Sequence, residues 1–181
     1  MADIKLKKAA LKEGGKKGID LVGMREMGGV QFFCLSVETA GDSMELLHEI
    51  MAGANKPVDP NEEEKKGGAE KIGKIFLSAG DKTLAIIAHV PEELSKETDI
   101  TVEKWMDALL TPLGTCAEVE KCSDDEYTKV VVKPKKGYFP LKLREDAINA
   151  SFAFLRQNGL VPPEEDSDDD VNYAEVAGVE W

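Results

Sequence analysis

The order of apolar patterns between residues 30 and 113 restricts the fold of this chain more than any other feature. Residues 30–37 are rich in β-branched and aromatic side chains and form too short a run for a buried helix. They therefore predict a strand that is covered on both faces. Apolar residues at helical spacing follow and predict a helix that Asp42 or Ser43 caps and that ends near Gly53.

Two more strands and a second helix complete this block. Residues 75–77 and 84–90 flank a turn-forming loop at 79–82, which predicts a β-hairpin. The second strand is almost continuously apolar, which indicates a central position in a sheet, and Pro91 ends it because proline has no N–H to donate. Thr101 is expected to cap a helix whose inward face carries Val102, Trp105, Met106, Leu109 and Leu110.

The rest of the chain predicts a second hairpin and a third main helix. Residues 116–121 and 127–133 flank a turn-like Ser-Asp-Asp sequence at 123–125. Residues 141–155 have helical spacing, and Asn158 and Gly159 mark the end of that helix. We therefore expect one layered α/β (or α+β) domain over residues 26–161, with a mixed five-stranded sheet and three main helices.

Charge is concentrated at the two ends of the chain. The net charge is −12, and residues 162–181 hold eight acids and no base. Such a segment cannot bury enough apolar surface to order itself, so a disordered acidic C-terminal tail is expected. Residues 1–25 hold seven bases against three acids and are expected to form a separate basic segment, with a short amphipathic helix before Gly14 and Gly15. This helix could dock on RNA, on an acidic protein or on the chain's own tail.

Several residue types that often carry chemistry favour structural interpretations here. Gly68 and Lys74 have the spacing of a phosphate-binding loop, but neither a preceding strand nor a following helix is predicted, so residues 68–74 are interpreted as a flexible connector. His89 is expected at a strand end and His48 at a solvent-facing helical position, while Cys34 should act as a small buried hydrophobe. We expect no metal, no cofactor and no catalytic residue.

The sequence also indicates a compartment. The three cysteines, an odd number, form no disulfide framework, and no apolar run suggests a signal peptide or a membrane span. A cytoplasmic, intracellular protein without a membrane partner is expected.

A basic run after the second hairpin is the main candidate binding site. The candidate RNA-binding residues are Lys133, Lys135, Lys136, Tyr138, Lys142 and Arg144. Lysines attract phosphates, and an exposed Tyr138 or Phe139 could stack on a base. The alternative is an ordinary solvated loop in which Phe139 belongs to the core.

The acidic tail offers a second candidate site. The acids around Ser167 make it a candidate for phosphorylation by an acidophilic kinase. Tyr173 and Trp181 are the aromatic residues of this segment and are candidates for contact with a partner protein.

The pattern of residues 30–113 resembles the DHH-associated C-terminal domain of alanyl-tRNA synthetase. The closest stretch is residues 73–94, where a short strand, a polar turn and an aliphatic strand precede a helix. The resemblance implies a noncatalytic module that engages tRNA. The family's Gly-rich segment after the second helix has no counterpart here, because residues 113–117 lead into a predicted strand, so none of its binding residues can be transferred.

Two functions follow from these observations. The first is a noncatalytic RNA-associated module, similar to a tRNA-binding domain. The alternative is an acidic interaction or assembly factor that presents its tail to a basic protein partner.

Overall fold

The fold was analysed in a computed structural model of the chain, which describes residues 4–28, 31–37, 40–41, 43–57, 61, 67–121 and 127–160. The predicted turn at 123–125, the alternative cap Asp42 and the C-terminal candidates Ser167, Tyr173 and Trp181 lie outside these ranges.

One mixed sheet organises the described part of the chain. Its strands are β1 (Phe32–Val37), β2 (Gly73–Ala79), β3 (Leu84–His89), β4 (Ala117–Lys121) and β5 (Thr128–Pro134). They lie in the order β1-β2-β3-β5-β4, with β1 and β2 parallel and the other neighbours antiparallel. The predicted five-stranded mixed sheet and both predicted hairpins are therefore confirmed.

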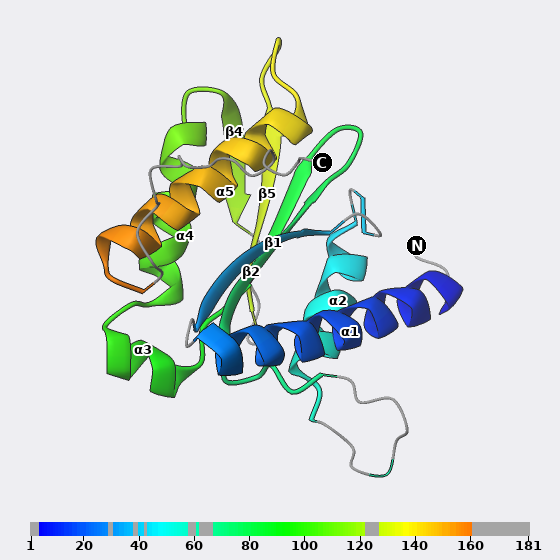
Figure 1. Cartoon of the computed structure of the whole chain (residues 1–181). Helices are drawn as coiled ribbons and strands as arrows, with labels where there is room; N and C mark the ends of the chain where they lie inside the picture. The colour runs from blue at the N-terminus through cyan, green and yellow to red at the C-terminus, as the bar shows by residue number, and fades with distance from the viewer. Residues whose placement is uncertain are drawn as a thin grey trace, which may run out of the picture.

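Helices cover both faces of this sheet (Figure 1). They are α1 (Ile4–Gly28), α2 (Met44–Asn55), α3 (Glu92–Thr98), α4 (Val102–Leu110) and α5 (Pro140–Gln157), with a short 3₁₀ helix, η1 (Thr111–Leu113), after α4. In Figure 1, α4 and α5 lie on one side of the sheet and α2 on the other, with α1 outside α2. The α/β class is confirmed, and none of the described helices is long and apolar enough to cross a membrane.

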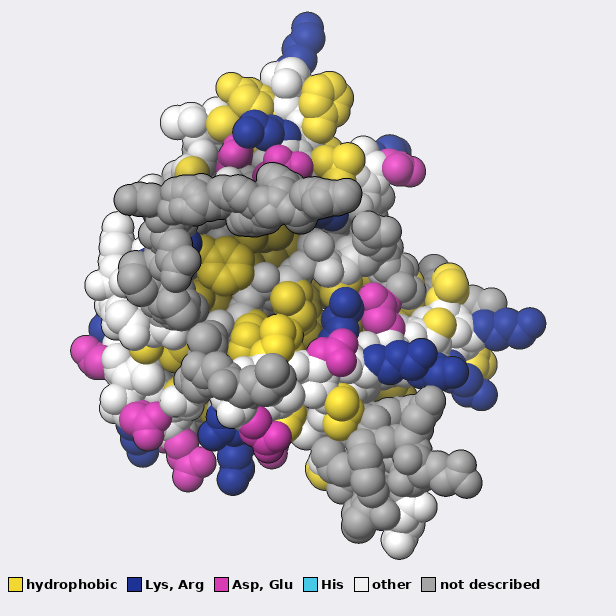
Figure 2. Space-filling model, in the orientation of Figure 1, with side chains coloured by type: hydrophobic (Ala, Val, Ile, Leu, Met, Phe, Trp, Pro, Cys, Tyr) yellow, Lys and Arg dark blue, Asp and Glu magenta, His cyan; other side chains and the backbone are white. Residues whose placement is uncertain are grey.

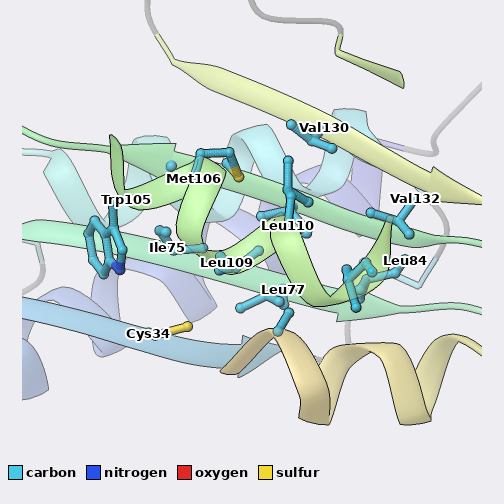
Figure 3. Packing of buried hydrophobic residues seen from close by; sticks show 14 of the residues in the cluster. Cys34, Ile75, Leu77, Leu84, Trp105, Met106, Leu109, Leu110, Val130 and Val132 are labelled. Atoms are coloured by element: carbon cyan, nitrogen blue, oxygen red, sulfur yellow. The ribbon is translucent and has the colours of Figure 1, made fainter. Parts of the chain in front are cut away.

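Alternate residues of the central strands supply two separate cores, because successive side chains of a strand point to opposite faces. On one face, side chains of the sheet pack with Trp105 and Leu109 of α4 (Figure 3). On the other, Phe76 and Ile87 pack with Ile50 of α2. Strand β3 lies between β2 and β5, as its apolar sequence predicted.

The first core contains a small polar contact that ties α4 to α5. The Trp105 Nε1 donates to Ser151 Oγ at 2.8 Å, which satisfies two buried polar groups. Phe32 of β1 meets the Trp105 ring edge-on, with centroids 5.4 Å apart. Burial raises the pKa of the nearby Cys34 thiol to about 12, so this cysteine is packed and protonated, as expected from its position in the strand.

The predicted helix starts are also found in the structure. The Ser43 hydroxyl accepts from the Leu46 N–H at the start of α2, and the Thr101 hydroxyl accepts from the Lys104 N–H at the start of α4, both at 3.1 Å. Each side-chain oxygen satisfies an N–H that has no partner within its helix.

The N-terminal helix differs from the prediction. It was expected to be short and to precede Gly14 and Gly15, but α1 runs through both residues for 25 residues. A Cβ on Gly14 would collide with the Ile50 carbonyl, and one on Gly53 of α2 would collide with the Leu11 carbonyl. These glycines therefore permit close backbone contact between α1 and α2, which offsets their weak helix propensity.

The segment before β2 also differs from what the sequence predicted. The N–H groups of Gly67, Gly68 and Ala69 donate to carbonyls of Gly15, Lys56 and Ala54, respectively, at 2.7–2.9 Å. Gly67 and Gly68 have φ of 82° and 86°, a region that favours glycine. The interpretation of residues 68–74 as flexible is therefore wrong, because backbone bonds fix residues 67–69 to both helices.

The α1–α2 contact can be tested with two substitutions in one helix. We expect Gly14→Ala to lower the free energy of unfolding by about 1–3 kcal/mol, because the new methyl group overpacks the interface. Gly23→Ala is the matched control, since a Cβ there would meet nothing within 4 Å. It should leave the stability unchanged or raise it by about 0.5–1 kcal/mol. Urea unfolding measures both values, and equal stabilisation by the two variants would contradict the close contact.

Candidate functional site

The connection between β5 and α5 is a tight turn that places two lysines at the surface. The Tyr138 N–H donates to the Lys135 carbonyl at 3.0 Å, which closes the four-residue turn 135–138. Gly137, the third residue of this turn, has φ of 92°. A positive φ at that position is typical of a type II turn and requires glycine or asparagine. The turn therefore holds Lys135 and Lys136 on an exposed tip between the strand and the helix.

Large, exposed apolar side chains follow these lysines in the sequence. Tyr138, Phe139 and Leu141 are 44%, 69% and 58% exposed, respectively. Phe139 is the extended N-cap residue of α5, and Pro140 begins the helix at a position where a missing N–H costs nothing. Figure 2 shows hydrophobic side chains and lysines gathered at the top of the molecule, where Figure 1 places this connection. The alternative in which Phe139 belongs to the core is therefore wrong.

The structure separates the predicted basic residues into two kinds. Lys133 lies 3.7 Å from Glu120, Lys142 lies 3.2 Å from Asp146, and both are thus partly neutralised. Arg144 is half-buried on α5, with an Nε that has no hydrogen-bond partner among the described residues. Lys135 and Lys136 are exposed and form no ion pair within the described part of the chain. These two lysines therefore supply the unneutralised positive charge of the connection between β5 and α5.

The turn that carries Tyr138 is tied to the residue before β4. The nearby Cys116 thiol, which precedes β4, raises the pKa of Tyr138 above its ordinary value. The Lys135 N–H donates to the Cys116 carbonyl at 2.9 Å and ties the same turn to this residue. The ring is therefore neutral at physiological pH, positioned beside the lysines, and exposed. Such a ring can stack on a planar ligand. We refer to residues 135–142 as the β5–α5 corner.

The second basic region lies elsewhere on the molecule. The lysines of α1 belong to the layer outside α2, whereas the β5–α5 corner leads into the helix that covers the opposite face of the sheet (Figure 1). The two regions therefore form separate surfaces.

Strand β2 contains a buried cation, Lys74, whose burial was not predicted from the sequence. Lys74 is completely buried, and its Nζ donates to the carbonyls of Ala69 and Ile72 at 2.7 and 2.8 Å. A third contact, of 3.2 Å, joins it to Nδ1 of His89 on β3. Because an ammonium group only donates, this nitrogen accepts. The Lys74 amine points at carbonyls and an imidazole, so it is not arranged to bind a phosphate.

Both ionisable groups of this pair are strongly perturbed. Burial lowers the pKa of Lys74 to about 7, and the Glu70 carboxylate acts in the opposite direction. Burial and then the Lys74 charge lower the pKa of His89 to about 4. With all its protons donated inside the protein, Lys74 is not available as a nucleophile, and the pair holds the segment before β2 against the sheet.

The chain's two histidines meet around one tyrosine. The Tyr127 ring lies edge-on to His48 and His89, with centroids 5.2 and 5.6 Å apart, and its hydroxyl accepts from Asn55 Nδ2 at 3.3 Å. The expectation that His48 faces solvent is therefore wrong, because it is half-buried against this ring. Within the described ranges, no group of three or more His, Cys, Asp and Glu residues could hold a metal ion.

A sequence signal for the Lys74–His89 pair did exist. The hairpin loop closes with the Gly80 N–H donating to the Thr83 carbonyl at 2.9 Å. Counting back from the strand ends on either side of this loop aligns Lys74 with His89. A lysine and a histidine directly opposite each other in an otherwise apolar hairpin indicate a polar pair.

Comparison of the chain with models of protein families, with curated proteins and with solved structures found no match.

The Lys74–His89 pair predicts a pH dependence of stability. Between pH 6.5 and 4 the unfolded chain protonates this histidine and the folded chain does not, so the free energy of unfolding should fall as the pH decreases. We expect a loss of roughly 2 kcal/mol, because the ring is only partly buried.

The matched variant is His89→Asn, which keeps an acceptor for Lys74 but does not titrate. Urea unfolding at pH 6.5 and pH 4 should show a smaller decrease for this variant than for the parent chain. Identical decreases would show that His89 does not titrate in this way.

Proposed function

We propose that this chain is a noncatalytic RNA-associated module that binds RNA at the β5–α5 corner. The observation that carries the proposal is the exposure of Tyr138 and Phe139 next to Lys135 and Lys136, which pair with no acid among the described residues. Exposed cations attract phosphates without regard to sequence, and aromatic rings stack on unpaired bases. This combination favours a single-stranded or looped RNA, because bases in a duplex are not free to stack on a side chain.

The similarity of residues 30–113 to the DHH-associated domain of alanyl-tRNA synthetases supports the same proposal. That family implies a tRNA ligand, and tRNA offers single-stranded loops and a single-stranded end. The proposed binding residues lie outside the similar block, in the part of the chain that follows it. The binding surface is thus proposed from its own geometry.

The net charge of −12 affects how such a surface should bind. The long-range field of the chain repels nucleic acid, so attraction is restricted to the corner itself. We therefore expect weak binding that depends on a few contacts and that strengthens steeply as the salt concentration falls.

The phosphate contacts can be counted from the salt dependence. For single-stranded nucleic acid, each phosphate contact contributes about 0.7 to the slope of log K against log salt. Lys135→Ala with Lys136→Ala should therefore reduce this slope by about 1.4. The measurement is fluorescence anisotropy with a labelled single-stranded oligouridine and, separately, with unfractionated tRNA.

The control for this variant is Lys96→Ala with Lys104→Ala, which removes the same charge from α3 and α4. These lysines pair with Glu92 and Asp99. The control should bind RNA as the parent chain does. An equal loss in both double variants would mean that binding follows total charge, and no loss in either would remove the corner from consideration.

Stacking requires a separate test. We expect Tyr138→Ala and Phe139→Ala each to weaken oligouridine binding by about 1–3 kcal/mol, the range for loss of one base-aromatic stack. Tyr138→Phe keeps the ring and should retain most of the affinity. Because these side chains are exposed, thermal unfolding should be nearly unchanged in all three variants. If Tyr138→Phe lost as much affinity as Tyr138→Ala, the hydroxyl rather than the ring would be the binding group.

A further inference from the structure

Three lysines line a small pocket between α1 and α2. Its volume is about 180 Å³, and it is lined by Lys8, Leu11, Lys12, Gly15, Gly53 and Lys56. It lies where the two helices are in close contact, since a Cβ on Gly53 would collide with the Leu11 carbonyl. We call these six residues the α1–α2 pocket.

The lysines of this pocket form no ion pair with any described residue. Elsewhere on α1, Lys7 pairs with Glu45 at 3.0 Å and Lys17 with Glu13 at 4.0 Å. Lys8, Lys12 and Lys56 are exposed and form no such pair. Lys8 and Lys12 are one helical turn apart, and like charges at this spacing destabilise a helix slightly. An anionic occupant would relieve this repulsion.

The pocket is apolar as well as cationic. Leu11 is 38% exposed at its edge, and Leu6 and Ile4, further along the same helix, are 47% and 69% exposed. Gly15 and Gly53, which also line the pocket, contribute no charged side chain. An occupant that combines acidic groups with an apolar or aromatic side chain would satisfy both properties.

The chain itself carries a segment with this chemistry. Residues 162–181 have eight acids and no base, and their larger apolar residues are interspersed among those acids: Val171, Tyr173, Val176, Val179 and Trp181. By contrast, α1 has seven bases and three acids. We propose that residues 168–181 dock on the α1–α2 pocket of the same molecule, with acids against the three lysines and an aromatic side chain against Leu11.

The length of the chain permits this contact. Leu160 is the last described residue, and the 21 residues after it span up to about 70 Å when extended. A domain of this size is about 40 Å across. Attachment to the same chain gives the tail an effective concentration in the millimolar range, so even weak contacts can keep the pocket occupied.

Amide NMR signals of Gly15 and Gly53 in the full chain test the proposal, because these residues line the pocket. Replacing Asp168, Asp169, Asp170, Glu175 and Glu180 by their amides should shift both signals and leave Gly137, at the β5–α5 corner, unchanged. Raising the salt concentration to about 1 M should shift them in the same direction, since salt screens exposed charges.

The fluorescence of Trp181 gives a second readout. Trp105 is fully buried, and its own fluorescence can be measured in a Trp181→Phe chain. Acrylamide should quench Trp181 less in the full chain than in a synthetic peptide of residues 162–181, and Lys8→Glu with Lys12→Glu should raise quenching to the peptide value. Lys135→Glu with Lys136→Glu is the matched charge reversal at the other basic surface and should have no effect.

Each other result would overturn the proposal. No shift at Gly15 and Gly53 with peptide-like quenching would mean that the tail does not dock. Release by Lys135→Glu with Lys136→Glu would place it at the corner. If tenfold dilution abolished the changes in the Gly15 and Gly53 signals, the tail would dock on a second copy of the chain and not on its own molecule. A response of the two glycines to inorganic phosphate alone would identify a phosphate site. None of these measurements involves RNA, so the outcome is independent of the proposed function.

Discussion

The burial of β3 on both faces is the constraint on which the rest of this structure depends. Its residues alternate between two cores, and each core recruits its own helices: α4 and α5 on one face, α2 on the other. Because β2 pairs with β3 in a tight hairpin while β1 joins β2 in parallel, the chain must pass through α2 to reach the hairpin. The two exposed surfaces for which binding is proposed then lie at the outside of this arrangement, on the outermost helix and at the connection into α5.

Local sequence patterns predicted the five strands and the helices α2, α4 and α5, because each of these elements has a clear signal. Strand β3 has an apolar run closed by Pro91, and α4 has the Thr101 cap followed by helical spacing. The length of α1 could not be predicted in this way. Glycines normally weaken a helix, and their benefit here depends on the backbone of α2, which is remote in sequence. The fixed position of residues 67–69 escaped prediction for the same reason, since their partners are carbonyls of α1 and of the end of α2.

The candidate site was predicted in composition but not in detail. Charge and aromatic residues in one loop indicated the β5–α5 corner, whereas the tight turn around Gly137 was not predicted. Which lysines are free of acids depends on pairs such as Lys133 with Glu120, which only the strand pairing brings together. The same applies to Lys74 and His89. In the sequence, Lys74 looks like an ordinary charged residue, but in the structure it is the most deeply buried cation of the described residues.

The seclusion of Lys74 also distinguishes it chemically from the lysines at the surface. An amine that donates to two carbonyls and an imidazole, with no contact to solvent, cannot be reached by an acetylating enzyme or an amine-reactive reagent while the sheet is intact. Modification at this residue can therefore occur only before the hairpin closes or after it opens. A covalent modification found on Lys74 would therefore show that the chain had been unfolded when the reagent or enzyme reached it. An acetylated or alkylated amine could no longer make all three contacts when the chain folded again.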